Sequence, residues 1–207
     1  MTGREQFLRD FNVPRGTELL FDRYAELLVD WQGRMNLVGR STLEQLWQRH
    51  FADSAQLVEL APKRAARWLD MGAGAGFPGI VVAILTDHAV TLVEATGKKC
   101  RFLEAVIDHL GLPNVTVGNH RIEAFRGGSF DVISARAFAP LPKLLELGLP
   151  HARTDTLWLL PKGQHIEREL DEARNLFDFS AELVPSRTDP RGQIVLATNV
   201  RRKANRQ

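Results

Sequence analysis

The chain is 207 residues long, with 44% hydrophobic residues, 25% charged residues and a formal net charge of +2. This balance is typical of a globular protein with a buried core, and the length excludes two full catalytic domains. A single cysteine, Cys100, excludes a disulfide framework and a zinc site built from cysteines, so we expect no metal centre.

The N-terminus is charged and lacks the apolar core of a signal peptide. No stretch approaches the roughly 18 apolar residues that a membrane helix needs. Together with the single cysteine, these features predict a cytoplasmic protein that does not enter a membrane.

Residues 1–62 are predicted to form a helical extension. Apolar side chains recur at spacings of three and four between Leu20 and Met35, on one face of a helix. Ser41 and Glu44 match a capping box, which predicts the start of a second helix that continues to about residue 58. A basic, alanine-rich linker at 63–67 then leads into a second unit, residues 63–207.

This second unit alternates between strands and helices. Strands are expected near 67–71, 89–94, 114–118, 130–135, 155–160, 181–184 and 193–198, and helices near 78–86, 98–110, 140–149 and 164–177. Repeated strand-then-helix units predict an α/β fold with a parallel sheet covered on both faces. No helix is evident between the last two strands, so we expect them to form an antiparallel hairpin at one edge.

The most informative segment is LDMGAGAGFPG, residues 69–79. A short apolar strand ends in an acid, and three alternate glycines follow: Asp70, Gly72, Gly74 and Gly76. Glycines let the backbone turn tightly and let a ligand approach with no Cβ in the way. A dinucleotide site would require glycine where this chain has Phe77. The spacing therefore favours S-adenosylmethionine over NAD or FAD.

Two acids belong to this pattern. Asp70 stands beside the glycines, where a carboxylate suits the ammonium group of S-adenosylmethionine. Glu94 ends the second strand, 24 residues later, and an acid at that place accepts hydrogen bonds from a ribose diol. The combination predicts a cofactor site at the carboxyl ends of the first two strands.

The fourth strand, SFDVISARAF, ends at Arg136. It lacks the acid or asparagine, paired prolines and aromatic residue that amino-methylating enzymes carry there. Cys100 is predicted inside the helix after the second strand, so it is expected to pack in the core and not to act as a nucleophile. A methyl acceptor that needs no deprotonation, such as guanine N7, is consistent with a site that lacks both the amino-methylation residues and a cysteine nucleophile. Arg136 is then available to hold the cofactor carboxylate, guanine O6 or a phosphate.

The C-terminal end is basic. From Arg187 onward six basic residues face one acid, a net charge of +5, so residues 1–186 carry −3. Arg201, Arg202 and Lys203 are therefore candidates for binding RNA phosphates, and a solvated terminus is the alternative.

Several segments together resemble the bacterial ribosomal RNA small subunit methyltransferase G family, formerly the glucose-inhibited division protein B family. They are MNLVGRSTLEQLWQRHFADS (35–54), DMGAGAGFPGI (70–80), GKKCRFL (97–103), HRIEAF (120–125), SARAF (134–138) and PKGQ (161–164). The resemblance implies a Rossmann-like, seven-stranded S-adenosylmethionine-dependent methyltransferase fold. It also implies methylation of guanine N7 in the decoding-region loop of 16S ribosomal RNA. The expected partner is that RNA or the small ribosomal subunit, with no obligate protein partner.

The resemblance also implies roles for individual residues. Cofactor contacts are expected at Gly72, Phe77, Ile122, Glu123 and Arg136. Arg136 and Lys162 are the expected catalytic residues. The RNA face or the pocket wall is expected to include Asn36, His50, Asp53, Lys98 and Arg121. From its place on the helix, His50 fits a core position as well as a site position.

Three other functions remain open at this point. A small-molecule or protein methyltransferase would use the same cofactor domain with a deeper, more apolar pocket. A non-catalytic RNA-binding module would retain the fold, although the intact acids and glycines count against it. A nicotinamide oxidoreductase is disfavoured by Phe77.

Overall fold

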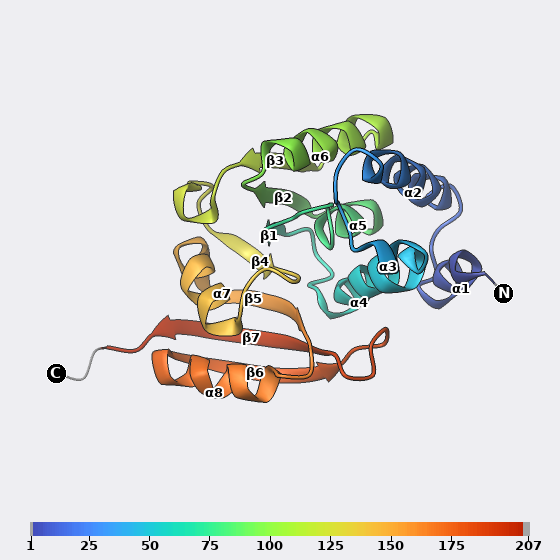
Figure 1. The fold of residues 1–207 in the computed structure, drawn as a ribbon. Helices are drawn as coiled ribbons and strands as arrows, with labels where there is room; N and C mark the ends of the chain where they lie inside the picture. The colour runs from blue at the N-terminus through green and yellow to red at the C-terminus, as the bar shows by residue number, and fades with distance from the viewer. Residues whose placement is uncertain (1, 205–207) are drawn as a thin grey trace.

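The computed structural model describes residues 2–204, which form one seven-stranded sheet with helices on both faces (Figure 1). The strands are β1 (Arg67–Met71), β2 (Ala89–Glu94), β3 (Val115–Asn119), β4 (Phe130–Ser134), β5 (Ala152–Lys162), β6 (Phe177–Pro185) and β7 (Gln193–Arg202). Their order in the sheet is β3-β2-β1-β4-β5-β7-β6. Strands β1 to β5 are parallel, whereas β7 runs antiparallel to both β5 and β6. The predicted fold class and the terminal hairpin are confirmed.

Eight α-helices connect or precede these strands within residues 2–204. They are α1 (Gly3–Asp10), α2 (Glu18–Gln32), α3 (Arg40–Leu43), α4 (Asp53–Leu60), α5 (Gly79–Leu85), α6 (Gly97–Leu110), α7 (Leu141–Gly148) and α8 (Ile166–Leu176). A π-helical turn at Trp47–Ala52 precedes α4, and short 3-10 turns lie at Ile122–Ala124 and Leu149–His151. In the described part of the chain, no helix has both the length and the apolar character needed to cross a membrane.

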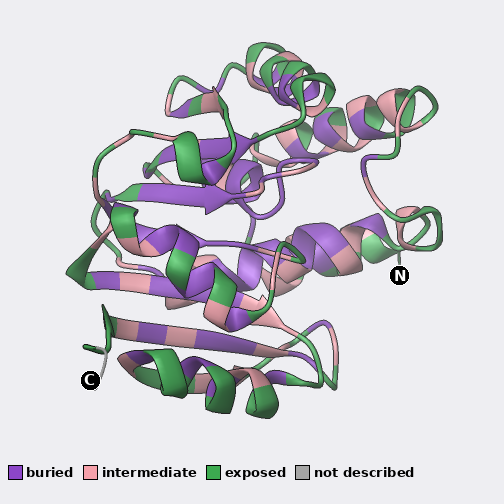
Figure 2. Cartoon of the chain, turned by 60° about the vertical axis from the view of Figure 1, so that its left-hand side comes forward, coloured by how far each residue is buried: buried purple, intermediate pink, exposed green. Residues whose placement is uncertain are grey.

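The sheet separates two apolar cores because successive side chains of a strand point to opposite faces. On β1, Trp68 packs in the core beneath α5 and α6, whereas Leu69 and Met71 pack in the core beneath α7 and α8. Buried residues consequently fill the central strands, and exposed residues lie on the outer faces of the helices (Figure 2). This two-sided burial explains why the central strands read as nearly continuous apolar runs.

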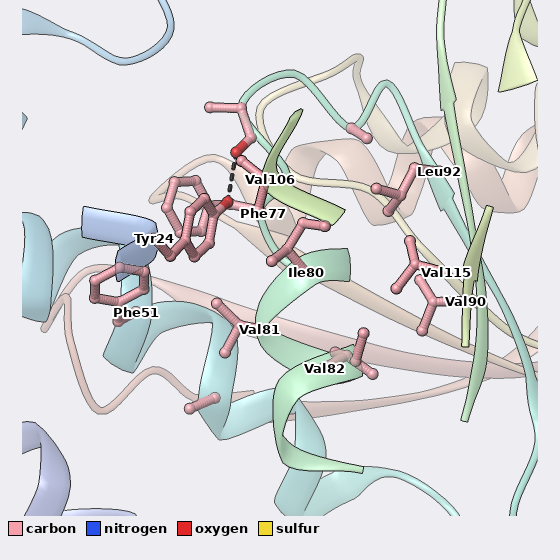
Figure 3. Close-up of a cluster of buried hydrophobic side chains, with 14 of the residues drawn as sticks. Tyr24, Phe51, Phe77, Ile80, Val81, Val82, Val90, Leu92, Val106 and Val115 are labelled. Carbon is pink, nitrogen blue, oxygen red and sulfur yellow. Dashed lines mark hydrogen bonds between the residues drawn. The ribbon is translucent and has the colours of Figure 1, made fainter. Parts of the chain in front are cut away.

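The N-terminal helices belong to the first of these cores. Phe7, Phe21 and Phe51 are fully or almost fully buried, and Phe51 packs against the Phe77 ring of the glycine turn. Tyr24 of α2 stacks on Phe77 with ring centroids 5.3 Å apart and donates its hydroxyl hydrogen to the carbonyl oxygen of Ala75 (Figure 3). The extension therefore supports the turn from behind.

The predicted capping box at Ser41 and Glu44 is wrong. Helix α3 begins at Arg40, with Gly39 as its N-cap residue and no side-chain cap, so Ser41 lies inside the helix. An N-cap side chain must stand before the first turn to accept a hydrogen bond from its amides. The expected single helix is instead divided into α3, the π-helical turn and α4. The capping box that does form joins Thr2 and Glu5 at the start of α1.

Candidate active site

The three glycines after β1 have left-handed backbones, with φ of +67° at Gly72, +58° at Gly74 and +91° at Gly76. A Cβ at Gly72 would lie 2.5 Å from the ring of Phe138, and one at Gly76 would lie 2.6 Å from the Tyr24 hydroxyl. At Gly74 a Cβ would meet only the carbonyl oxygen of Gly72, at 3.8 Å. Packing therefore requires glycine at two positions, while Gly74 faces open space in a cleft.

Asp70 lies beneath this turn and does not line a cleft. Its carboxylate is fully buried and accepts hydrogen bonds from the Gly79 amide (2.9 Å) and the Ser134 hydroxyl (2.8 Å). The indole N–H of Trp68 donates to the same hydroxyl. Burial raises the pKa of Asp70 to about 7, although the two hydrogen bonds and Arg136 oppose the shift. Asp70 thus joins the start of α5 to the end of β4, and helps to set the path of the glycine turn that runs from β1 to α5.

Glu94 does face a cavity. Its two carboxylate oxygens accept hydrogen bonds from the amides of Gly74 (3.0 Å) and Thr96 (2.8 Å). The cavity, of about 340 Å³, is also lined by Ile122 and Glu123. A carboxylate has about four acceptor positions, so roughly two remain for hydroxyl groups of a ligand. The geometry fits a ribose diol, and Ile122 offers an apolar surface beside it.

A second, larger cleft of about 570 Å³ adjoins this cavity, and Gly72, Lys99 and Ala137 line both. Residues from separate segments meet in it: His50, Asp53, Phe77, Arg136 and Lys162. The combined space is in the range of ligand sites. The carboxyl ends of the central strands, where ligands bind in open α/β sheets, therefore carry one continuous two-part site.

Arg136 is the centre of a hydrogen-bond network in the larger cleft. Its Nη1 donates to the carbonyl oxygen of Arg49 and to Asp53 Oδ2, at 3.0 and 3.1 Å. Its Nη2 lies 2.9 Å from His50 Nδ1, and its guanidinium carbon lies 5.1 Å from the centre of the Phe77 ring. Three of the five guanidinium N–H groups are engaged in this way, so two remain for a ligand.

His50 is neutral in this network. Desolvation, followed by the charges of Arg136 and Arg49, lowers its pKa to about 3. Because Arg136 can only donate, His50 Nδ1 accepts its hydrogen bond. The other ring nitrogen lies 2.9 Å from the Thr42 hydroxyl. His50 is therefore a buried residue of the cleft wall whose two nitrogens are both engaged.

Lys162 ends β5 at the opposite wall of the cleft. Its ammonium lies 2.6 Å from Glu169 and 2.9 Å from the carbonyl oxygen of Ala139. Cys100 is buried in α6, where its thiol contacts the carbonyl oxygen of Glu94 and burial raises its pKa. The expectation that Cys100 packs in the core is confirmed.

The other predicted residues are divided between the site and the opposite edge of the sheet. Arg121 lines the smaller cavity, Lys98 is exposed on the first turn of α6, and Asn36 is exposed and lines neither cavity. Because β7 runs antiparallel, its end lies at the edge of the sheet away from the cleft.

The tail residues at that end have acidic partners. Arg201 and Lys203 pair with Asp178, and Arg202 pairs with Glu146. Arg206, also counted in the basic end, lies outside the described residues.

Sequence reasoning missed the contribution of the β6–β7 loop and of the segment after β4. Thr188 donates a hydrogen bond to Asp53 Oδ1 at 2.7 Å, and Gln193 lines the cleft at the start of β7. Ala137 has a left-handed backbone (φ +51°), which residues other than glycine adopt rarely. The predicted hairpin could have indicated the contribution of the β6–β7 loop, because the turn of that hairpin must lie at the carboxyl end of β5, beside the cleft. No group of His, Cys, Asp or Glu within residues 2–204 is arranged to hold a metal ion.

Sequence comparisons connect the chain with one family. The family model described as GidB, rRNA small subunit methyltransferase G, matches residues 18–193. A protein of that name from Zymomonas mobilis is 43% identical, over 98% of this chain and 96% of its own length. Another from Caulobacter vibrioides is 48% identical, over 84% of this chain and 81% of its own.

Solved structures share the fold at low sequence identity. A mutant of MtNAS in complex with S-adenosylmethionine superposes with a TM-score of 0.61 at 20% identity, over 93% of this chain and 76% of that chain. A ribosomal protein L11 methylase from Lactobacillus delbrueckii gives a TM-score of 0.57 at 19% identity, over 73% of this chain and 77% of that chain.

Gly74 offers a test of the cofactor loop. Replacing it by valine (Gly74→Val) places a branched side chain in the open space of the cleft, so we expect affinity for S-adenosylmethionine to fall at least tenfold, about 1.4 kcal/mol, in calorimetric titration. Gly111→Val is the matched control, because Gly111 has a similar φ of +64° and open surroundings at the end of α6. Gly111→Val should lose as much stability as Gly74→Val and keep the wild-type affinity for S-adenosylmethionine. Equal affinities in the two variants would contradict this placement of the loop.

The buried carboxyl of Asp70 predicts a pH dependence of stability. Its folded pKa of about 7 lies above the ordinary 3.8, so the folded state holds the proton more tightly than the unfolded state. This contribution to stability is complete below about pH 4 and is lost as the pH rises through 7. The advantage of the wild type over Asp70→Asn in urea unfolding should therefore shrink between pH 5 and pH 8. A constant difference would show that this pKa is not raised.

Proposed function

The chain belongs to the rRNA small subunit methyltransferase G family, and from that premise we propose that it transfers a methyl group to N7 of a guanine in 16S ribosomal RNA. Members of the family are S-adenosylmethionine-dependent methyltransferases, and this chain is one of them. The observation that carries the finer proposal is the two-part site. A cofactor-sized cavity at Glu94 opens into a cleft where the acidic and imidazole groups are already engaged.

The residues around the smaller cavity fit the cofactor. Glu94 is placed to accept hydrogen bonds from the ribose hydroxyls, and Ile122 to contact the adenine ring. In the adjoining larger cleft, Gly74 leaves room for the amino-acid part of the cofactor, and Arg136 retains two N–H groups for its carboxylate. When bound, S-adenosylmethionine supplies an electrophilic methyl group on a sulfonium centre.

The larger cleft suits an acceptor that carries its own lone pair. His50 has no ring nitrogen to spare, and Asp53 accepts hydrogen bonds from Arg136, Thr188 and Gln56. Glu169 is held by Lys162 and the Leu141 amide. None of these groups is poised to remove a proton. Guanine N7 has no proton to lose, so the residues need only align the acceptor and tolerate its developing positive charge.

The surface around the cleft supports RNA as the substrate. Arg121 lines the smaller cavity, and Arg40 and Lys98 adjoin the cleft residues Gly39 and Lys99 in the chain; among the described residues, these three basic side chains are exposed and form no ion pair. Unpaired basic side chains at the mouth of a cleft attract phosphates, which position a nucleic acid without reading its sequence. We also propose a cytoplasmic location, where ribosomal RNA is found, and 16S RNA or the small ribosomal subunit as the partner.

The chemistry is tested by the product and by its pH dependence. Small subunits from a strain that lacks this methyltransferase should gain 7-methylguanosine, detected by nucleoside mass spectrometry. Because His50 stays neutral and N7 needs no base, the rate should be nearly flat from pH 6 to 9. Cys100→Ala should keep most activity, whereas Arg136→Ala should lose at least tenfold, about 1.4 kcal/mol of transition-state stabilisation.

Two results would contradict this mechanism. One is a product methylated at cytosine C5 or on an exocyclic amine. The other is a rate inflection near neutrality that persists in Asp70→Asn, because that variant removes the buried carboxyl whose pKa is raised to about 7.

The position of the RNA face is tested by charge reversal. The pair Lys98→Glu with Arg121→Glu should weaken RNA binding at least tenfold, about 1.4 kcal/mol, and flatten its salt dependence, because fewer counterions are released. The pair Arg201→Glu with Arg202→Glu makes the same charge change at the opposite edge and should have a smaller effect on both. Equal losses of RNA affinity in the two pairs of variants would indicate that the tail contacts phosphates as much as the cleft does.

A further inference from the structure

Gln193 has an unpartnered polar group in the larger cleft. Its Oε1 is buried, and no hydrogen-bond partner for it exists within residues 2–204. Within the same residues, the only other buried side-chain atom without a partner is Nε1 of Trp158, which lies in the apolar core beneath α7. Gln193 instead lines the cleft together with Lys162, its neighbour across the β5–β7 pairing.

The lack of a hydrogen-bond partner distinguishes Gln193 from the polar groups around it. Arg136, His50, Asp53 and Lys162 are all engaged in hydrogen bonds or ion pairs within the protein. Leaving a buried acceptor unpaired is unfavourable for the folded state. Oε1 is closed to solvent in this conformation, so a donor on the ligand reaches it when the terminal amide rotates toward the cleft that Gln193 lines.

The position of Gln193 indicates which ligand it faces. It begins β7, four strands along the sheet from Glu94 at the end of β2. At a spacing of about 4.8 Å between strands, the two positions lie on the order of 19 Å apart along the sheet. Glu94 belongs to the cofactor cavity, so Gln193 belongs to the acceptor side of the cleft, across from the glycine turn.

We propose that Gln193 is a specificity-determining residue that recognises the acceptor guanine by its Watson–Crick edge. This assignment rests on the proposed function. The carboxamide Oε1 accepts a hydrogen bond from the 2-amino group of guanine. Adenine carries its amino group at C6 and none at C2, so adenine held in the same orientation would leave Oε1 unpaired.

The same arrangement orients the reacting atom. N7 lies on the five-membered ring, on the side of guanine away from N1 and the 2-amino group. A base held by Gln193 at the acceptor wall therefore presents N7 toward the glycine turn and Arg136. Recognition and alignment follow from one contact.

The test compares Gln193→Met, which keeps the side-chain length and removes both polar groups, with the wild type and with Gln164→Met. Gln164 is an exposed glutamine just beyond the end of β5 and does not line the cleft. On small subunits that lack the modification, Gln193→Met should lose at least tenfold in kcat/KM while its affinity for S-adenosylmethionine is unchanged. Gln164→Met should keep wild-type kcat/KM.

Thermal unfolding separates recognition from a structural role. Because Oε1 has no partner inside the protein, Gln193→Met should unfold at the same temperature as the wild type or a higher one. A clear fall in the unfolding temperature would show that the amide stabilises the protein, and would overturn the assignment.

An RNA substrate with inosine at the target tests the atoms involved, because inosine lacks only the 2-amino group. The wild type should lose activity on it, and Gln193→Met should show no further loss, since the coupled contact is already absent. Equal losses in both proteins would overturn the assignment of Gln193 to this edge.

The two proposals fail in different ways. A wild-type protein that makes no 7-methylguanosine overturns the proposed function together with this assignment. Wild-type activity with an unimpaired Gln193→Met variant overturns the role of Gln193 alone.

Discussion

The ion pair between Arg136 and Asp53 holds together segments that lie far apart in the sequence. Arg136 follows β4, Asp53 begins α4, and Asp53 also accepts the hydroxyl hydrogen of Thr188 from the β6–β7 loop. Both charged side chains are largely buried, so each depends on the other and on the surrounding donors for its solvation. Removing either partner would leave an uncompensated charge beneath the cleft. The N-terminal extension, the parallel sheet and the terminal hairpin are thus coupled at the point where the substrate must bind.

This coupling also explains the chemistry that the cleft can perform. Groups that would serve as acids or bases in another enzyme are used here to position one another. His50 orients Arg136, Glu169 holds Lys162, and Asp70 is covered by the turn. Cleft residues that hydrogen-bond to one another form a rigid wall, which is suited to aligning two reactants. Methyl transfer to an acceptor with no proton to lose depends mainly on that alignment.

Much of the fold was predictable from local patterns, because burial on both faces of a parallel sheet leaves continuous apolar strands. The glycine turn was predictable because left-handed backbone at Gly72, Gly74 and Gly76 restricts the residue type. Other features depend on distant partners. Ser41 and Glu44 match a capping box in the sequence, but the helix begins at Arg40 with Gly39 as its N-cap residue, and the sequence does not show that starting point. The burial of Asp70 follows from Ser134, 64 residues later, and the sequence alone does not show that these two side chains meet. The unpaired oxygen of Gln193 is visible only once the cleft is formed.

The direction of β7 has a practical consequence. Its first residue stands at the cleft, and its last residues, Arg201 and Arg202, stand at the opposite edge of the sheet. Anything attached beyond that edge, whether an affinity handle, a fluorescent reporter or a surface for immobilisation, starts on the far side of the molecule from the glycine turn. Tethered in this way, the protein presents its cleft outward, which suits capture assays with an object as large as a ribosomal particle.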